Sequence, residues 1–146
     1  MLVQLSLGTG LILVTMLLSG SAFLIVETMF SLRRPWLRRP PHAPKLLFAM
    51  CVSVFWVLAL MTVSVWSWAF SYWGLGIFAT LEEAVYFSLV SFTTLGFGDV
   101  LLPQEWRLLS GMEAVNGLLM FGLLTAVLVE VLRRGREVQA EYEGRS

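Results

Sequence analysis

Three long stretches of this chain carry almost no charged side chain. Residues 1–26 and 46–81 hold none, and residues 108–132 hold only Glu113 and Glu130. A helix of about 20 residues, rising 1.5 Å per residue, crosses the ~30 Å hydrocarbon layer of a bilayer. The stretches therefore predict three transmembrane helices. With 58% hydrophobic and 14% charged residues, the composition also excludes an ordinary water-soluble domain.

The remaining composition excludes several classes of function. Ten basic and ten acidic residues cancel, so the chain has no net positive field that would attract nucleic acid. Cys51 is the only cysteine and His42 the only histidine. An internal disulfide, a zinc cluster and most catalytic triads are therefore excluded. We expect neither an enzyme nor a resident cofactor.

A fourth apolar segment, residues 84–98, is too short to span a bilayer. It has 15 residues and ends in a glycine-rich turn, which is typical of a re-entrant segment. Thr80 and Glu83 have the spacing of a capping box, so they predict a short helix over 81–92. Such a helix is ~18 Å long at 1.5 Å per residue and ends about halfway into the bilayer.

The basic residues divide unequally between the two sides of the membrane. Five of the ten lie between the first two spans, four follow the third span, and Arg107 alone lies on the opposite side. The positive-inside rule then places the N-terminus outside and the C-terminus in the cytoplasm. Three crossings give this arrangement of the termini, so residues 84–98 must enter and leave the membrane by the same face. No basic residue precedes the first apolar run and no A-x-A-like exit follows it, so we expect a retained span and not a signal peptide.

Gly96 and Gly98 occupy alternate positions after the short helix. Successive carbonyl groups point to one side only when φ alternates in sign, and glycine adopts positive φ at low cost. A column of carbonyl oxygens supplies ligands to a dehydrated cation without adding charge, and Thr94 can add a ring of hydroxyls below it. The C-terminus of the preceding helix carries partial negative charge, which favours a cation at mid-membrane.

Seven consecutive residues resemble the T-T-V-G-Y-G-D signature of the potassium-channel pore-domain family: Thr93, Thr94, Leu95, Gly96, Phe97, Gly98 and Asp99. Leucine replaces valine and phenylalanine replaces tyrosine. The resemblance covers residues 46–132 and implies a selectivity filter over 94–98, flanked by Thr93 and Asp99. By the same resemblance, four residues bind K⁺: Thr94, Leu95, Gly96 and Phe97.

The resemblance also divides the chain into parts. We expect an N-terminal transmembrane helix over 1–32, a cytoplasmic, basic and proline-rich loop over 33–45, a pore domain over 46–132 and a short cytoplasmic tail over 133–146. Within the pore domain we expect an outer helix at 46–72, a pore helix at 81–92, a filter at 93–99 and an inner helix at 106–132. The first helix has no counterpart in the minimal two-helix design.

The predicted inner helix carries residues with distinct expected roles. Gly117 resembles the hinge glycine of the family. Helical phase places four residues on one stripe, which we assign to the lining of the cavity: Leu118, Phe121, Thr125 and Val129.

Glu113 is an acidic residue inside this apolar helix. It lies about 140° around the helix from Leu118, at 100° per residue. We therefore expect it to face the pore helix or the outer helix, with Thr62, Ser64 or the filter backbone as its partner. Two interpretations stay open: a brace behind the filter, or an interfacial acid that reaches water. The neighbouring Asn116 is a candidate for a hydrogen bond between subunits.

One chain supplies one such loop, and four loops are needed to surround an ion, so we expect a homotetramer. The predicted fold is an all-α membrane protein with three transmembrane helices, a re-entrant pore helix and a filter loop. The expected function is passive, potassium-selective conduction by a multi-pass protein of a prokaryotic inner membrane, with anionic lipids near the loop arginines. Two alternatives stay open: a non-selective cation channel, and an accessory subunit that keeps the fold without conducting.

Overall fold

The computed structural model describes residues 1–32 and 42–143, which form α-helices and one short 3-10 helix without any strand. The elements in chain order are α1 (Leu2–Leu32), α3 (His42–Gly74), α4 (Leu81–Phe92), η1 (Gln104–Trp106) and α5 (Arg107–Glu143). Three segments of these helices are long and apolar enough to cross a membrane: Leu2–Ser21, Leu47–Gly74 and Gln104–Arg133. The predicted all-α membrane fold with three spans is confirmed.

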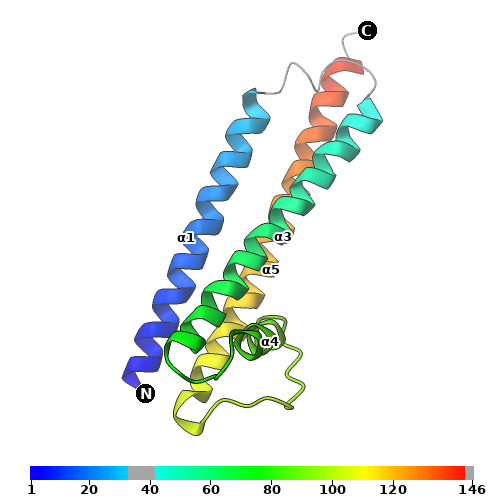
Figure 1. Ribbon diagram of the computed structural model, residues 1–146. Coiled ribbons are helices and arrows are strands. Elements are labelled where there is room, and N and C mark those ends of the chain that lie inside the picture. The colour runs from blue at the N-terminus through cyan, green and yellow to red at the C-terminus, as the bar shows by residue number, and fades with distance from the viewer. Residues whose placement is uncertain (33–41, 144–146) are drawn as a thin grey trace.

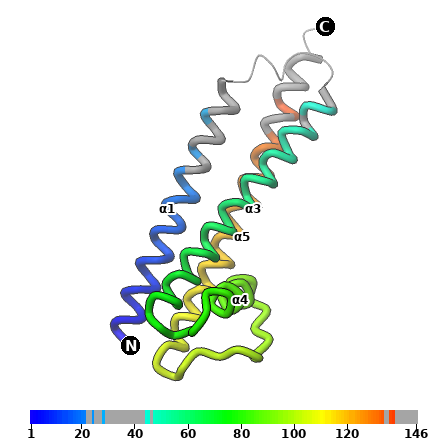
Figure 2. The backbone as a smooth tube through the Cα atoms, in the orientation of Figure 1, coloured from blue at the N-terminus to red at the C-terminus, as the bar shows by residue number. Residues whose placement is uncertain are grey.

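The three long helices run lengthwise beside one another, and α4 lies at one end of them (Figure 1). The N-terminus lies at the end that carries α4, and the C-terminus lies at the opposite end. The tube in Figure 2 follows the same course, with α4 packed against α3 and α5. The segment between α3 and α5 therefore leaves and returns at one end, as the count of basic residues required.

The second long helix begins earlier than the sequence predicted. The expected loop extended over 33–45, whereas α3 begins at His42. Pro44 lies in the first turn of α3, where a missing backbone N–H removes no intrahelical hydrogen bond. Most of the predicted loop lies outside the described residues.

The third long helix continues beyond its predicted end at 132. α5 extends to Glu143, so most of the segment that was expected to be a short tail is helical. Arg133 forms ion pairs at 2.8 Å with Glu130 and at 2.9 Å with Glu137. Pairs three and four residues apart lie on one face of a helix and stabilise it, which supports the extension of α5 past the apolar span.

Two clusters of buried side chains hold α4 against the long helices. The first contains Ala84 and Phe87 of α4 together with Tyr72 of α3 and Leu109 of α5. The rings of Tyr72 and Phe87 pack edge to face, with centroids 5.4 Å apart. The second cluster contains Phe92 at the end of α4. Because the two clusters contain residues from opposite ends of α4, they fix both the position and the direction of this helix.

Candidate functional site

The start of α4 is set by the capping box that the sequence predicted. Thr80 has an extended backbone, with φ −120° and ψ 149°, and its hydroxyl accepts a hydrogen bond from the Glu83 backbone N–H at 3.2 Å. Glu82 and Glu83 place negative charge in the first turn, where the helix dipole is positive. The opposite, partially negative end of α4 leads directly into residues 93–98.

The C-terminus of α4 forms a Schellman motif, which leads into residues 93–98. The backbone N–H of Thr94 donates to the carbonyl of Ser91, and that of Leu95 donates to the carbonyl of Val90, both at 3.0 Å. Glycine usually occupies the left-handed position of this motif, but here Thr94 has φ +60°. A left-handed residue with a Cβ costs roughly 1–2 kcal/mol. Such strain persists only where the surrounding structure determines the conformation, which is the case at the end of α4.

Positive φ recurs at every second residue after α4. The φ angle is +60° at Thr94, +56° at Gly96 and +78° at Gly98, while Leu95 and Phe97 between them have no positive φ. An alternation in the sign of φ turns successive carbonyl groups towards the same side. The spacing of the two glycines predicted this pattern, and Thr94 extends it by one step.

Residues 94–99 lie exposed on the surface of the single chain. The side chains of Leu95 and Phe97 are 60% and 65% exposed although both are large and apolar. Across residues 1–32 and 42–143, no hydrogen bond reaches a carbonyl oxygen of residues 94–98. Because residues 94–98 are exposed, their carbonyl oxygens are accessible to water or to a ligand from outside the chain.

Asp99, directly after this row, is held by a side chain of α4. The Tyr86 hydroxyl donates to Asp99 Oδ2 at 2.5 Å. This hydrogen bond lowers the pKa of Asp99, because it stabilises the carboxylate, and it raises the pKa of Tyr86. The sequence placed Asp99 beside the filter but carried no signal that Tyr86 would be its partner.

Replacing Tyr86 with phenylalanine is expected to lower the stability of the protein at neutral pH and to make that stability less dependent on acid pH. Without the phenol, the pKa of Asp99 rises towards its usual value of about 3.9. Because the folded-state pKa of Asp99 is lowered, its contribution to stability is present above the unfolded-state pKa and is lost as the pH falls through the folded-state pKa. The thermal midpoints of the two proteins are therefore expected to differ at pH 7 and to converge towards pH 3, which a series of melts between these pH values measures.

The matched control for this prediction is the Asp99→Asn variant, in which the carboxyl group is absent. Tyr86→Phe introduced into that background is expected to leave the shape of the acid profile unchanged. Superimposable acid profiles for the wild-type protein and Tyr86→Phe would contradict the proposed coupling.

Glu113 lies fully buried where α5 meets α3 and α4. Its side chain is 0% exposed, so the interpretation of an interfacial acid that reaches water is wrong for this chain. The Tyr72 hydroxyl donates to Glu113 Oε2 at 2.7 Å, and the Ser88 hydroxyl contacts Oε1. Ser88 Oγ also lies 2.9 Å from the carbonyl oxygen of Val65. One carboxyl group thus links all three helices behind residues 93–98.

The partners of Glu113 differ from the expected ones, although it faces both helices that the helical phase indicated. Thr62 instead donates to the carbonyl of Leu58 within its own helix, at 2.8 Å. Ser64 lies 3.3 Å from the side chain of Asn116. Asn116 is fully buried within the chain, so its partners belong to the same subunit and not to a neighbouring one. The reason is that α1 packs against α5 and covers this residue.

Gly117 is a point of close approach between α5 and α4. A Cβ atom at this position would collide with the backbone carbonyl of Phe92, the last residue of α4. Around Gly122, five residues later on α5, nothing lies within 4 Å of the equivalent position. The lack of a side chain at Gly117 therefore has a packing reason, in addition to the hinge role that the resemblance implied.

The four residues assigned to the cavity lie on an uncovered face of α5. All of them are exposed in the single chain: Leu118, Phe121, Thr125 and Val129. The residues on the other face of the same helix are buried against α1 and α3, among them Met120 and Leu124. The Phe121 ring contacts the Phe92 ring at the end of α4, with centroids 6.2 Å apart, but all four residues remain exposed, as the lining of a shared cavity requires.

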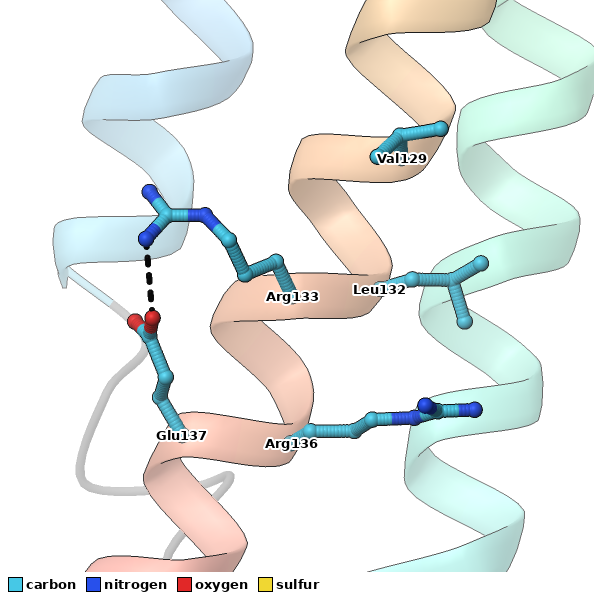
Figure 3. Close-up of a pocket in the computed structure, with 5 residues that line it drawn as sticks. All are labelled: Val129, Leu132, Arg133, Arg136 and Glu137. Atoms are coloured by element: carbon cyan, nitrogen blue, oxygen red, sulfur yellow. Dashed lines mark hydrogen bonds and ion pairs between the residues drawn. The ribbon is translucent and has the colours of Figure 1, made fainter.

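An open pocket of about 440 Å³ lies at the other end of α5 (Figure 3). Arg133 turns towards Glu137 on one side of the helix, while Leu132 and Arg136 extend on the other side. Val129 completes the lining. Because α4 packs at the opposite end of the long helices, this pocket is separate from residues 93–98.

Comparison with known proteins gives one match. A family model described as an ion channel matches residues 46–134, which is more than half of the chain and includes α4 and the row of carbonyls after it. α1 lies outside the matched region. No curated protein and no solved structure matches the chain significantly.

Proposed function

The chain belongs to a family of ion channels, and from this premise we propose that it conducts potassium ions passively through a pore built from four copies. Four copies of residues 94–98 around a common axis supply rings of carbonyl oxygens, which replace the hydration water of K⁺. Repulsion between neighbouring ions moves them along the file. No bond forms or breaks, so the proposal contains no enzymatic step and no cofactor.

One observation supports this proposal above all others. The backbone after α4 alternates in the sign of φ at Thr94, Gly96 and Gly98, and its carbonyl oxygens have no partner in the described part of the chain. The partially negative end of α4 faces the same segment. The proposed ligands of K⁺ are the oxygens of Thr94 to Phe97, with Gly98 completing the filter and Thr93 and Asp99 flanking it.

The exposed apolar surface beside the filter supports a homotetramer. Leu95, Phe97 and Leu101 are each more than half exposed in the single chain. A group of exposed large apolar side chains marks a site of association. We propose that copies of the chain cover it with cyclic four-fold symmetry, which brings the four filters to one axis.

The proposed orientation places α4, the filter and the N-terminus outside the cell. It follows from the positive-inside rule. The C-terminal end of α1, the start of α3 and the C-terminal end of α5 lie away from α4 (Figure 1), and in the sequence nine of the ten basic residues are close to these helix ends. Basic residues at this end also favour contact with anionic lipids of the cytoplasmic leaflet. A prokaryotic inner membrane is the proposed location.

Glu113 is proposed to brace the filter from behind, since it joins the pore helix to both long helices. The Glu113→Gln variant is expected to retain most of the conduction, because its amide can donate to Ser88 and accept from Tyr72. In Glu113→Leu the Tyr72 hydroxyl stays buried without its partner, which costs about 1–3 kcal/mol per chain. We therefore expect a lower thermal midpoint and a smaller tetramer fraction for Glu113→Leu, both measured in detergent.

A double variant separates this brace from general loss of packing. Adding Tyr72→Phe to Glu113→Leu removes the orphaned hydroxyl and is expected to restore part of the lost stability, because both partners are then apolar. Equal thermal midpoints for Glu113→Gln and Glu113→Leu would argue that Glu113 is no brace.

The proposed function is tested by reconstituting the purified protein alone into lipid bilayers and measuring currents. We expect a reversal potential close to the K⁺ equilibrium potential when both sides contain K⁺ and Na⁺ in opposite ratios. A reversal potential near zero would identify a non-selective cation channel, against which Phe97 and Gly98 argue. A properly folded tetramer that carries no current would identify an accessory subunit.

A further inference from the structure

The first helix, which the family match leaves out, docks on α5 through a narrow polar stripe. The stripe consists of small or polar residues that lie on one face of α1 and are buried: Gln4, Gly8, Thr15 and Ser19. The side-chain amide of Gln4 donates to the backbone carbonyl of Glu105 in η1. Small and polar residues of this kind allow transmembrane helices to approach closely and to bond with each other.

Further contacts extend this interface down the outer half of α5. A Cβ at Gly8 would lie 2.5 Å from Met112 Sδ, so the thioether of Met112 fills the space that glycine leaves. Further along α1, the Ser19 hydroxyl lies 3.0 Å from Met120 Sδ. The stripe on α1 thus follows the part of α5 that packs against α4, as the parallel course of the two helices near that end shows (Figure 2).

Asn116 is the junction at which α1 meets both other long helices. Its Oδ1 lies 3.1 Å from the Thr15 hydroxyl of α1, and its Nδ2 lies 3.3 Å from the Ser64 hydroxyl of α3. All three side chains are buried. The amide serves the two hydroxyls in either orientation, because each hydroxyl both donates and accepts. Hydrogen bonds are directional and apolar packing is not. A buried amide between three helices therefore fixes their relative positions more closely than apolar packing alone.

This junction lies directly beside the contact that supports the filter. The next residue, Gly117, touches the carbonyl of Phe92, and Phe92 immediately precedes the filter segment. Met16, next to Thr15 on α1, packs against the buried cluster that contains Phe92 and Met120. A displacement of α1 therefore reaches the end of α4 through two adjacent residues of α5, Asn116 and Gly117.

We propose that α1 is a clamp on the outer half of α5 and that Asn116 is a positioning residue, which holds the end of the pore helix in register with the filter. The link to conduction rests on the proposed function. The docking of α1 itself does not, because it is a statement about the arrangement of the three long helices.

The docking of α1 is measured by disulfide formation. Cysteines placed by Gly8→Cys and Met112→Cys, in a full-length chain with Cys51→Ala, report how closely α1 lies against α5. We expect Thr15→Val, which keeps the shape of the side chain and removes its hydroxyl, to slow this cross-linking roughly three- to tenfold, as the loss of one interhelical hydrogen bond implies. Thr15→Ser keeps the hydroxyl and is expected to cross-link at the same rate as the double-cysteine parent.

Thr62→Val is the matched control, because the Thr62 hydroxyl bonds only within its own helix. Added to the double-cysteine parent, it is expected to leave the cross-linking rate unchanged.

The effect on the filter is measured as the rate at which K⁺ current declines after the K⁺ concentration is lowered. A loss of folded protein reduces the amount of current but leaves this rate unchanged. We expect Thr15→Val and Asn116→Leu to accelerate the decline severalfold, with Thr15→Ser restoring the wild-type rate and Thr62→Val leaving it unaffected.

Three outcomes decide the proposal. Unchanged cross-linking and unchanged current decline in Thr15→Val would overturn it. Slower cross-linking with an unchanged decline would overturn the positioning role of Asn116 alone. If the wild-type protein carries no K⁺ current, the proposed function fails, while the cross-linking rates still decide whether α1 is a clamp.

Discussion

Alanine at position 96 is expected to abolish potassium conduction while the chain still inserts and assembles. Gly96 has φ +56°, where an L-residue costs roughly 1–2 kcal/mol, or roughly 4–8 kcal/mol over four copies. Relaxing that strain turns the carbonyl before or after position 96 away from the axis, and each ring of the filter then loses ligands. Current in reconstituted bilayers, compared at equal amounts of tetramer, measures the loss.

The control for Gly96→Ala is an alanine that carries the same strain elsewhere. Gly76, in the turn between α3 and α4, has φ +69°, and no atom lies within 4 Å of the point that an added methyl group would occupy. Gly76→Ala is therefore expected to lower the stability of the fold by a comparable amount and to leave the current per tetramer intact. Conduction that survives in Gly96→Ala would remove the main support for a carbonyl-lined filter.

Alanine at position 117 is expected to eliminate conduction by a different route. The added methyl group collides with the Phe92 carbonyl, which is backbone and cannot rotate away. Overpacking of this kind costs typically about 1–3 kcal/mol per site, and four sites converge on one filter. We expect a tetramer of lower thermal midpoint without measurable K⁺ current, because either α5 or the end of α4 must shift.

Gly122→Ala is the control that separates two effects of Gly117→Ala. It removes a flexible glycine from α5 without causing a collision. Gly122 lies on the same helix with nothing within 4 Å, and replacing glycine by alanine in a helix interior generally favours the helix. We expect it to conduct and to be at least as stable as the wild-type protein. A conducting Gly117→Ala channel with altered open probability would instead support the hinge role of Gly117.

Local patterns in the sequence were sufficient to predict the features that depend on neighbouring residues. The capping box at Thr80 predicted where α4 begins, and α4 occupies Leu81–Phe92. The alternate spacing of Gly96 and Gly98 predicted alternating φ, because glycine alone adopts positive φ at low cost. Charge-free length predicted three spans, because the thickness of a bilayer sets that length.

Contacts between distant segments were only partly predictable. Helical phase indicated which way Glu113 faces, but its partners Tyr72 and Ser88 are 41 and 25 residues away, and their choice depends on how the helices cross. The docking of α1 was missed although small and polar residues recur on one face of this helix, because hydrophobic periodicity does not mark the packed face of a helix that lies in lipid. The buried position of Asn116 followed from that docking and was missed for the same reason.

The exposure of residues 94–99 on a single chain has a consequence for mixed assemblies. In the proposed tetramer each polypeptide supplies one quarter of the ring that meets the ion, so one defective copy impairs the three normal copies beside it. When normal and defective chains are made in equal amounts and mix freely, only about one-sixteenth of the tetramers contain four normal copies. Co-expressed variants of this segment are therefore expected to suppress the current of the normal protein, whereas variants that fail to insert are expected to leave it intact.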